Sequence, residues 1–166
     1  MQEAETKKTI LPGDYISGFV DGEGCFYLNF RKETKLNRPG APSYYRWIAY
    51  FAIMLDKSDV QILNSIQDTI GCGKVYTNQK NQVSLNVQNL DDCYKLLIPF
   101  FHLHKLRAKK KIDFELWSEA VTILFRLKKG ELKRDTLIDK QLEEIQNNMR
   151  RIKGNLKRGY KNNLKN

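Results

Sequence analysis

The spacing of apolar positions near the N-terminus predicts a short helix followed at once by a strand. Helical spacing is kept by Tyr15, Ile16, Phe19 and Val20. We expect Asp14 to cap this helix and Gly22 and Gly24 to end it, because Asp accepts hydrogen bonds from free helix N–H groups and glycine weakens a helix. From residue 25 to residue 33 the pattern alternates, as in a half-buried strand. Its apolar face carries Phe26, Leu28 and Phe30, and its polar face carries Tyr27, Asn29, Arg31 and Glu33.

A second strand is predicted over residues 44–55, YYRWIAYFAIML, after a loop that contains proline and glycine. Phe51 and Ile53 suit the core, whereas Arg46, Ile48 and Tyr50 are expected to face outward. A helix then follows Ser58 and stops at Gly71. Its apolar stripe consists of Val60, Leu63, Ile66 and Ile70.

The same order of elements then repeats. Two short strands are predicted at 74–78 and 82–88, with inward positions at Val75, Val83, Leu85 and Val87. Their outward positions are Lys74, Tyr76, Asn78, Gln82, Ser84 and Asn86. A third helix begins near Asp91, and we expect Pro99 to interrupt it. A long amphipathic helix before Gly130 has its stripe at Ile112, Leu116, Ala120, Val121 and Leu124, and a C-terminal helix has its stripe at Leu142, Ile145, Met149 and Ile152.

These elements describe an α+β fold of order αββαββα, with an antiparallel sheet backed by helices and further helices at the C-terminus. A chain of 166 residues suits one core, so we predict a single domain at 14–153 between an N-terminal arm, 1–13, and a basic tail, 154–166. No apolar run is long enough for a membrane span, and the N-terminus lacks the pattern of a secretion signal. Three cysteines without close pairing fit a reducing compartment.

The formal net charge of +10 points to a polyanionic partner. Much of that charge lies after residue 149, where the cations are Arg150, Arg151, Lys153, Lys157, Arg158, Lys161 and Lys165. A solvated tail and a phosphate-binding arm explain this run equally well, so charge alone does not establish the function. A zinc module built from Cys72, Cys93, His102 and His104 fails on spacing, because no close cysteine pair is present.

Two acids wedged between glycines stand out in YISGFVDGEG, residues 15–24. Gly18 and Gly22 lie four residues apart on one helix face, so two such helices can approach closely. Close packing would bring two copies of Glu23 together, beside helix C-terminal carbonyls that also favour a cation. Such a pair of carboxylates is costly without a metal, and its hard oxygen atoms suit Mg²⁺.

The stretch ISGFVDGEG resembles the LAGLIDADG motif, and the αββαββα order resembles the LAGLIDADG homing endonuclease fold. The basic segment LRAKKKIDFELW, residues 106–117, looks like the one that opens the family's later helix. The resemblance implies that Glu23 is the catalytic metal ligand, assisted by the carbonyl of Gly22, and that Asp21 is structural. It also implies that Lys109 stabilises the phosphate or assists the attacking water, while Arg107, Lys110 and Lys111 contact the DNA backbone. Where relatives often carry a water-ordering polar residue, this chain has Leu55.

Because the motif occurs once, the resemblance implies a homodimer that pairs through Gly18, Phe19 and Gly22 and cuts a long pseudo-palindromic double-stranded DNA target. Strand alternation places polar residues on a sheet face of the length of one DNA turn. The predicted DNA contacts are Tyr27, Asn29, Arg31, Arg46, Lys74, Tyr76, Asn78, Gln82, Ser84, Asn86, Lys110 and Lys111. A non-cleaving nucleic-acid-binding protein of the same fold, either an intron RNA maturase or a DNA-binding regulator, is the alternative. The expected location is an organelle or a prokaryotic cytoplasm.

Overall fold

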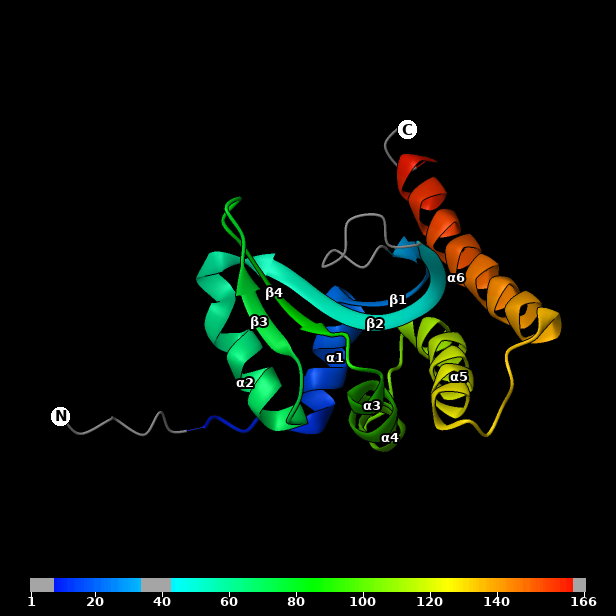
Figure 1. Ribbon diagram of the computed structural model, residues 1–166. Helices are drawn as coiled ribbons and strands as arrows, with labels where there is room; N and C mark the ends of the chain where they lie inside the picture. Colours follow the sequence, from blue (N-terminus) through cyan, green and yellow to red (C-terminus); the bar gives the residue numbers. More distant parts are fainter. Residues whose placement is uncertain (1–7, 34–42, 163–166) are drawn as a thin grey trace. The chain divides into compact units, whose positions relative to one another are not determined.

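The computed structural model describes residues 8–33 and 43–162, with side chains up to residue 154. The predicted arm before residue 8 and the tail cations from Lys157 onward lie outside the described side chains. The elements are α1 (Gly13–Glu23), β1 (Gly24–Glu33), β2 (Tyr44–Asp56), a 3-10 turn (Lys57–Asp59), α2 (Val60–Ile70), β3 (Lys74–Thr77), β4 (Gln82–Val87), α3 (Leu90–Asp92), a π-helical turn (Cys93–Leu97), α4 (Ile98–Leu103), α5 (Lys110–Lys129) and α6 (Thr136–Asn162) (Figure 1). The predicted α+β order is confirmed.

The four strands form one sheet in the order β1-β2-β4-β3. β4 runs antiparallel to β2 on one side and to β3 on the other. Ile53 pairs with Leu85, which in turn pairs with Val75, so apolar side chains line up across three strands. Ile53 and Leu85 are fully buried, as the alternation predicts.

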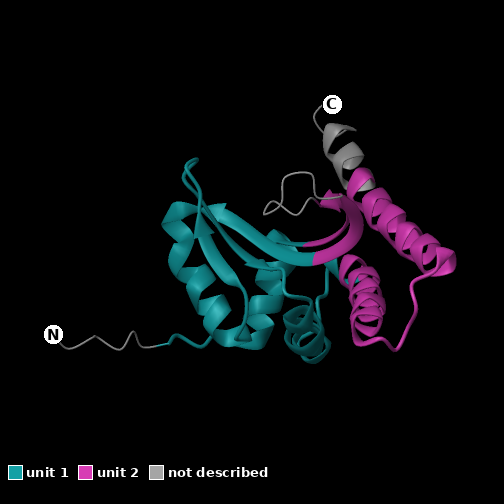
Figure 2. Ribbon diagram, viewed as in Figure 1, with its two compact units in different colours: residues 1–25, 50–111 teal, residues 26–49, 112–166 magenta. Residues whose placement is uncertain are grey.

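The chain divides into two compact units (Figure 2), and each has its own core. Residues 1–25 and 50–111 form the first unit, whose largest buried side chains include Phe51, Leu63 and Phe101. Residues 26–49 and 112–166 form the second unit. There the Phe26 ring packs 5.2 Å from that of Trp117 and 5.6 Å from that of Phe114, between centroids.

The start of α1 differs from the prediction. The helix begins at Gly13, with Pro12 in the cap position and no side-chain cap bond. Asp14 lies in the first turn, where a carboxylate complements the helix dipole, and it faces the Nδ1 atom of His104 at 3.3 Å. A Cβ atom at residue 13 would collide with the ring of His104, so packing against that ring selects glycine there.

α1 ends just before the second of the two glycines predicted to end it. Gly22 keeps the helical conformation, and the helix ends at Glu23 because Gly24 turns to an extended backbone with φ −71° and ψ 151°. A Cβ atom on Gly24 would lie 2.5 Å from the Val20 Cγ1 atom and 2.8 Å from the Val20 carbonyl oxygen. Only glycine therefore fits where β1 follows α1 without an intervening residue.

Pro99 does not interrupt the third helix. The helix changes register first, in the π-helical turn, where the Ile98 N–H donates to the Cys93 carbonyl five residues earlier. Pro99 then occupies the first turn of α4, where its missing N–H costs little. The helical path thus continues from Leu90 to Leu103 as three differently wound pieces.

The buried face of α5 is only partly the predicted one. Ala120 and Val121 are fully buried, but Ile112 is 50% exposed and Leu116 and Leu124 are half-buried. The core contacts come instead from Phe114 and Trp117, whose rings meet Phe26. Aromatic burial therefore rotates the helix away from the aliphatic stripe that the spacing suggests.

Candidate active site

Glu23 is the last residue of α1 and is exposed to solvent. Within the described residues, its carboxylate forms no hydrogen bond or ion pair. Gly22, one residue earlier, lies in the last helical turn, where backbone carbonyls lack an intrahelical N–H partner. The helix end thus presents a free carboxylate and carbonyl oxygen atoms to one side of the first unit.

Asp21 ties the predicted basic segment to this helix end. Its Oδ2 atom accepts the backbone N–H of Arg107 at 2.8 Å and that of Ala108 at 3.2 Å. The other oxygen, Oδ1, is buried without a hydrogen-bonding partner among the described atoms. The structural role expected for Asp21 therefore takes a specific form, which is the anchoring of residues 107 and 108 beside α1.

A second contact holds the same segment at the start of β1. The Lys110 ammonium lies 3.9 Å from the Cys25 thiol, and Lys110 is half-buried. Lys109 lies in the turn between these two anchors, is exposed, and makes no hydrogen bond or ion pair with another described residue. The role predicted for Lys109 stays a prediction.

One face of α1 is open. Gly18 and Gly22 are exposed, and a Cβ atom on either would meet nothing within 4 Å. Tyr15, 49% exposed, lies on the same face, with its ring centroid 6.3 Å from that of half-buried Phe19. The opposite face is fixed in the core by Ile16 and Val20 and by Ser17, whose hydroxyl donates to the His104 carbonyl oxygen at 2.6 Å.

In the second unit, the predicted DNA-contacting residues lie on β1 and β2. Two of them share an acid, because Arg46 pairs with Glu33 at 2.9 Å and the Arg31 Nε atom lies 3.8 Å from it. These ion pairs are largely exposed, so exchanging them for phosphate contacts costs little. Asn29 is half-buried, and so is Tyr27, whose ring lies under the Lys153 ammonium at 4.8 Å.

In the first unit, three predicted DNA-contacting residues gather at one place. Lys74, Tyr76 and Asn86 line a hollow of about 320 Å³ that Asp92 also borders. The Asn86 amide donates to the Ser84 hydroxyl at 2.8 Å. These side chains present both hydrogen-bond donors and hydrogen-bond acceptors.

Asn78 and Gln82 face outward, as the alternation predicts, but they also form hydrogen bonds that hold a turn. The side-chain Oδ1 atom of Asn78 accepts the backbone N–H groups of Lys80 and Gln82 at 2.9 and 3.1 Å, and the Asn78 side-chain amide donates to Gln82 Oε1 at 3.0 Å. Asn78 therefore holds the turn between β3 and β4, where Asn81 has a positive φ of 59°. Both residues remain exposed.

The oxygen atoms at the end of α1 suit a hard cation such as Mg²⁺, but one chain supplies only part of a site. Among the described residues, no group of three or more His, Cys, Asp or Glu is placed to hold a metal. The Glu23 carboxylate and the Gly22 carbonyl are hard oxygen ligands of the kind that Mg²⁺ prefers.

The sequence reasoning missed the anchors around the site. The bonds from Asp21 to residues 107 and 108 and the contact between Lys110 and Cys25 join segments more than 80 positions apart. No local pattern signals such pairs. The sequence gives one indication that the two acids have different roles. Asp21 and Glu23 are two residues apart in a helix, so their side chains point in different directions.

The model of the LAGLIDADG endonuclease family matches residues 16–121, which include most of α1, the four strands and the first part of α5. The chain belongs to the LAGLIDADG endonuclease family. The matched region contains Glu23 and Lys109 and ends before α6.

Curated relatives carry names of intron-encoded proteins. A probable intron-encoded DNA endonuclease 1 of Mycosarcoma maydis is 30% identical over 106 residues, which cover 64% of this chain and 35% of that protein. A probable intron-encoded endonuclease 3 of Neurospora crassa is 27% identical over 111 residues, 66% of this chain and 20% of that protein. The chain therefore spans about a third or less of these relatives.

Solved structures share the fold. The homing endonuclease I-TnaI superposes with a TM-score of 0.61 at 28% identity, covering 82% of this chain and 99% of that one. The LAGLIDADG homing endonuclease I-GzeII, in complex with its DNA target, gives a TM-score of 0.67 at 25% identity, covering 90% of this chain and 47% of that one. The predicted LAGLIDADG homing endonuclease fold is thus confirmed.

None of the helices among the described residues combines the length and apolarity that a membrane span requires.

Proposed function

We propose that this chain is a subunit of a site-specific, Mg²⁺-dependent endonuclease that cuts both strands of a long pseudo-palindromic DNA target as a homodimer. The observation that carries the proposal is the free carboxylate of Glu23 at the open end of α1, beside the segment that Asp21 anchors. Family membership and the DNA-bound relative I-GzeII support double-stranded DNA as the substrate. The names of the curated relatives support an origin in an intron.

The open face of α1 supports pairing with a second copy. Gly18 and Gly22 leave room for a partner backbone, and the Tyr15 and Phe19 rings offer apolar contact at the rim. Pairing of two such helices brings two Glu23 carboxylates to one place. The I-TnaI chain, of which this chain covers 99%, shows that a polypeptide of similar extent occurs in the family.

In the mechanism, Glu23 and the Gly22 carbonyl would hold Mg²⁺, which supplies an acidified water and neutralises charge on the phosphate. Lys109 donates from its ammonium to a non-bridging phosphate oxygen as negative charge develops there. Asp21 keeps the backbone before Lys109 in place, so less rotational freedom is lost when the phosphate arrives. Leu55 has no group that accepts a proton, so it cannot take the proton of the attacking water.

DNA binding would use the polar faces of both units. Arg31 and Arg46 would exchange Glu33 for phosphates, and Lys110 and Lys111 would add backbone contacts. Base contacts would come from Tyr27, Asn29, Lys74, Tyr76, Gln82, Ser84 and Asn86, whose groups match base edges in a major groove.

The decisive experiment incubates wild type, Glu23→Gln and Glu143→Gln with a randomised duplex library in Mg²⁺ or Ca²⁺, and sequences the bound and the cleaved molecules. Glu143 is the matched control, an exposed acid on α6 without a described partner. We expect wild type and Glu143→Gln to cleave one pseudo-palindromic site in Mg²⁺, and Glu23→Gln to bind that site without cutting. Sequence-specific binding without cleavage in any metal would favour the non-cleaving alternative, and cleavage by Glu23→Gln would overturn the site assignment.

A further inference from the structure

Three polar side chains of α6 are spaced seven residues apart, and each forms a hydrogen bond with one of the first two strands. The Asp139 carboxylate accepts the Trp47 indole N–H at 3.0 Å, the Gln146 amide donates to the Leu28 carbonyl at 2.7 Å, and the Lys153 ammonium donates to the Phe26 carbonyl at 2.6 Å. Seven residues are nearly two helical turns, about 10.5 Å, so the three side chains share one face. Buried Leu142, Ile145 and Met149 lie between them.

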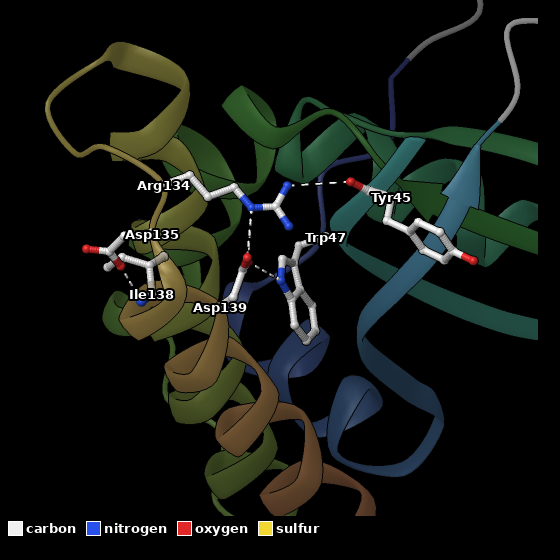
Figure 3. A network of polar contacts seen from close by, with 6 residues as sticks. All are labelled: Tyr45, Trp47, Arg134, Asp135, Ile138 and Asp139. Carbon is white, nitrogen blue, oxygen red and sulfur yellow. Dashed lines mark hydrogen bonds and ion pairs between the residues drawn. The ribbon is translucent and has the colours of Figure 1, made fainter. Parts of the chain in front are cut away.

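The first of these contacts is reinforced, as Figure 3 shows. Arg134 donates from its Nε atom to both oxygens of Asp139 at 3.0 and 3.1 Å, and its Nη1 atom lies 3.5 Å from the Tyr45 carbonyl oxygen. Asp135 caps α6 by accepting the Ile138 N–H at 2.8 Å. The start of α6 is therefore fixed against β2.

The other two contacts fall on the outer edge of the sheet. β1 is the first strand in the order β1-β2-β4-β3, and the carbonyls of Phe26 and Leu28, two residues apart, point to the same side. Side chains of α6 donate to both carbonyls.

Lys153 makes a second contact that Gln146 does not. Its ammonium lies 4.8 Å from the centre of the Tyr27 ring, the residue between the two anchored carbonyls. One side chain thus holds both the backbone before Tyr27 and the Tyr27 ring. A cation over a ring face attracts it and restricts its rotation.

We propose that Lys153 is a positioning residue that sets the orientation of Tyr27 and thereby the base preference at the DNA position that Tyr27 contacts. The inference rests on the proposed function, since it assumes that β1 contacts DNA. Lys153 lies outside the region that the family model matches, which ends at residue 121. It also gives α6 a task in recognition besides covering the sheet edge.

The test compares the base preferences of wild type and of a set of variants in a binding selection on a randomised duplex library. Lys153→Met keeps an unbranched side chain but removes the charge and the donor, and Lys153→Arg restores both. Lys140→Met removes the same charge from an exposed position of α6, and Gln146→Met removes the edge bond without touching Tyr27. These two separate the proposed effect from loss of charge and from weakening of the edge.

We expect Lys153→Met to change the preference at one or two adjacent target positions by roughly threefold. Tyr27→Leu should change the same positions, and adding Lys153→Met to Tyr27→Leu should change nothing more. Lys153→Arg should restore the wild-type preference, and the two controls should keep it. A uniform loss of affinity at unchanged preference in Lys153→Met would overturn the inference.

A second measurement needs no DNA. In protein with ¹³C-labelled tyrosine rings, Lys153→Met should shift the Tyr27 ring resonances and leave those of Tyr76 unchanged, because Tyr76 lies in the other unit. An unmoved Tyr27 signal would overturn the inference whatever the DNA result. Failure of wild type to select any duplex, with Tyr27 still responding to Lys153→Met, would overturn the proposed function and the recognition role but leave the positioning contact standing.

Discussion

Asp21 and Arg107 are joined by a hydrogen bond of 2.8 Å from the Arg107 backbone N–H to the Asp21 carboxylate, across 86 positions of the chain. The same carboxylate oxygen also accepts the backbone N–H of Ala108, so Asp21 holds two successive residues. Glu23 follows Asp21 by two residues, and Lys109 follows Arg107 by two. The anchor therefore joins the two short segments that carry the proposed metal ligand and the proposed phosphate-binding lysine.

Removal of this anchor should slow cleavage more than it weakens the fold. Asp21→Ala leaves two N–H groups without their acceptor and should lower the free energy of unfolding by about 1 to 2 kcal/mol. This loss is smaller than for a fully buried pair of hydrogen bonds, because Asp21 is partly exposed and water can replace its carboxylate. The cleavage rate should fall more than about tenfold, because Lys109 loses its fixed backbone. Asp21→Asn keeps one acceptor oxygen and should lie between. The measurements are denaturant unfolding and single-turnover cleavage, with Asp59→Ala as the control.

Lys109→Met should reduce catalysis but not binding. Loss of a donor that acts on developing phosphate charge costs about 10²-fold to 10³-fold in rate. The dissociation constant for target DNA should rise only by the small effect of one surface charge. Lys105→Met, which removes an exposed lysine four residues earlier, is the matched control. An equally slow Lys105→Met, or an unaffected Lys109→Met, would contradict the assignment.

Gly18→Ala should have opposite effects on the subunit and on the dimer. The added methyl group has free space in the chain and favours a helix, so the monomer should gain about 0.5 to 1 kcal/mol. The same methyl group would separate two paired helices, and sedimentation equilibrium should show weaker association. Gly24→Ala is the contrast, since its Cβ atom would strike Val20 and destabilise the fold itself. Unchanged association in Gly18→Leu would show that this face does not pair.

Stability should fall at high pH because of two buried thiols. Burial raises the pKa of Cys72 and of Cys93 from 9.0 to about 12, and Asp92 adds to the effect on both. The unfolded chain releases these protons first, so the stabilising effect is complete below pH 9 and is lost as the pH rises toward 12. Thermal unfolding between pH 8 and 11 tests this, with Cys72→Ser and Cys93→Ala as variants that should flatten the dependence. At pH 8, alkylation should modify half-buried Cys25 first.

The sequence predicted what depends on local periodicity. The buried positions of α2 and β4 and the stop at Gly71, in the left-handed region at φ 79°, follow from apolar spacing and from the freedom of glycine. Failures began where distant contacts decide. Asp14 faces His104, 90 positions away, and does not cap the helix. The Phe26 ring packs against Phe114 and Trp117, which are more buried than Ile112 and Leu116.

The site could be predicted in its residue types but not in its supports. The position of Glu23 at a helix end follows from the motif, whereas its role as a metal ligand stays a prediction. The pairing of Lys110 with Cys25, and of Lys153 with Phe26 and Tyr27, depends on where β1 and the later helices meet. No spacing rule connects residues so far apart in the chain.

The absence of any linker at Gly24 restricts how the specificity of such a protein can change. In the proposed function, Glu23 lies at the phosphate that is cleaved, and Tyr27 is the first residue of β1 that contacts a base. These two residues are four positions apart, which corresponds to about 13 Å of extended chain. A side chain at this junction would meet Val20, so the residue that joins α1 to β1 is itself restricted to glycine. We therefore expect new targets near the cut to arise through side-chain substitution at other positions, whereas the exposed turn between β3 and β4 has room for changes of length.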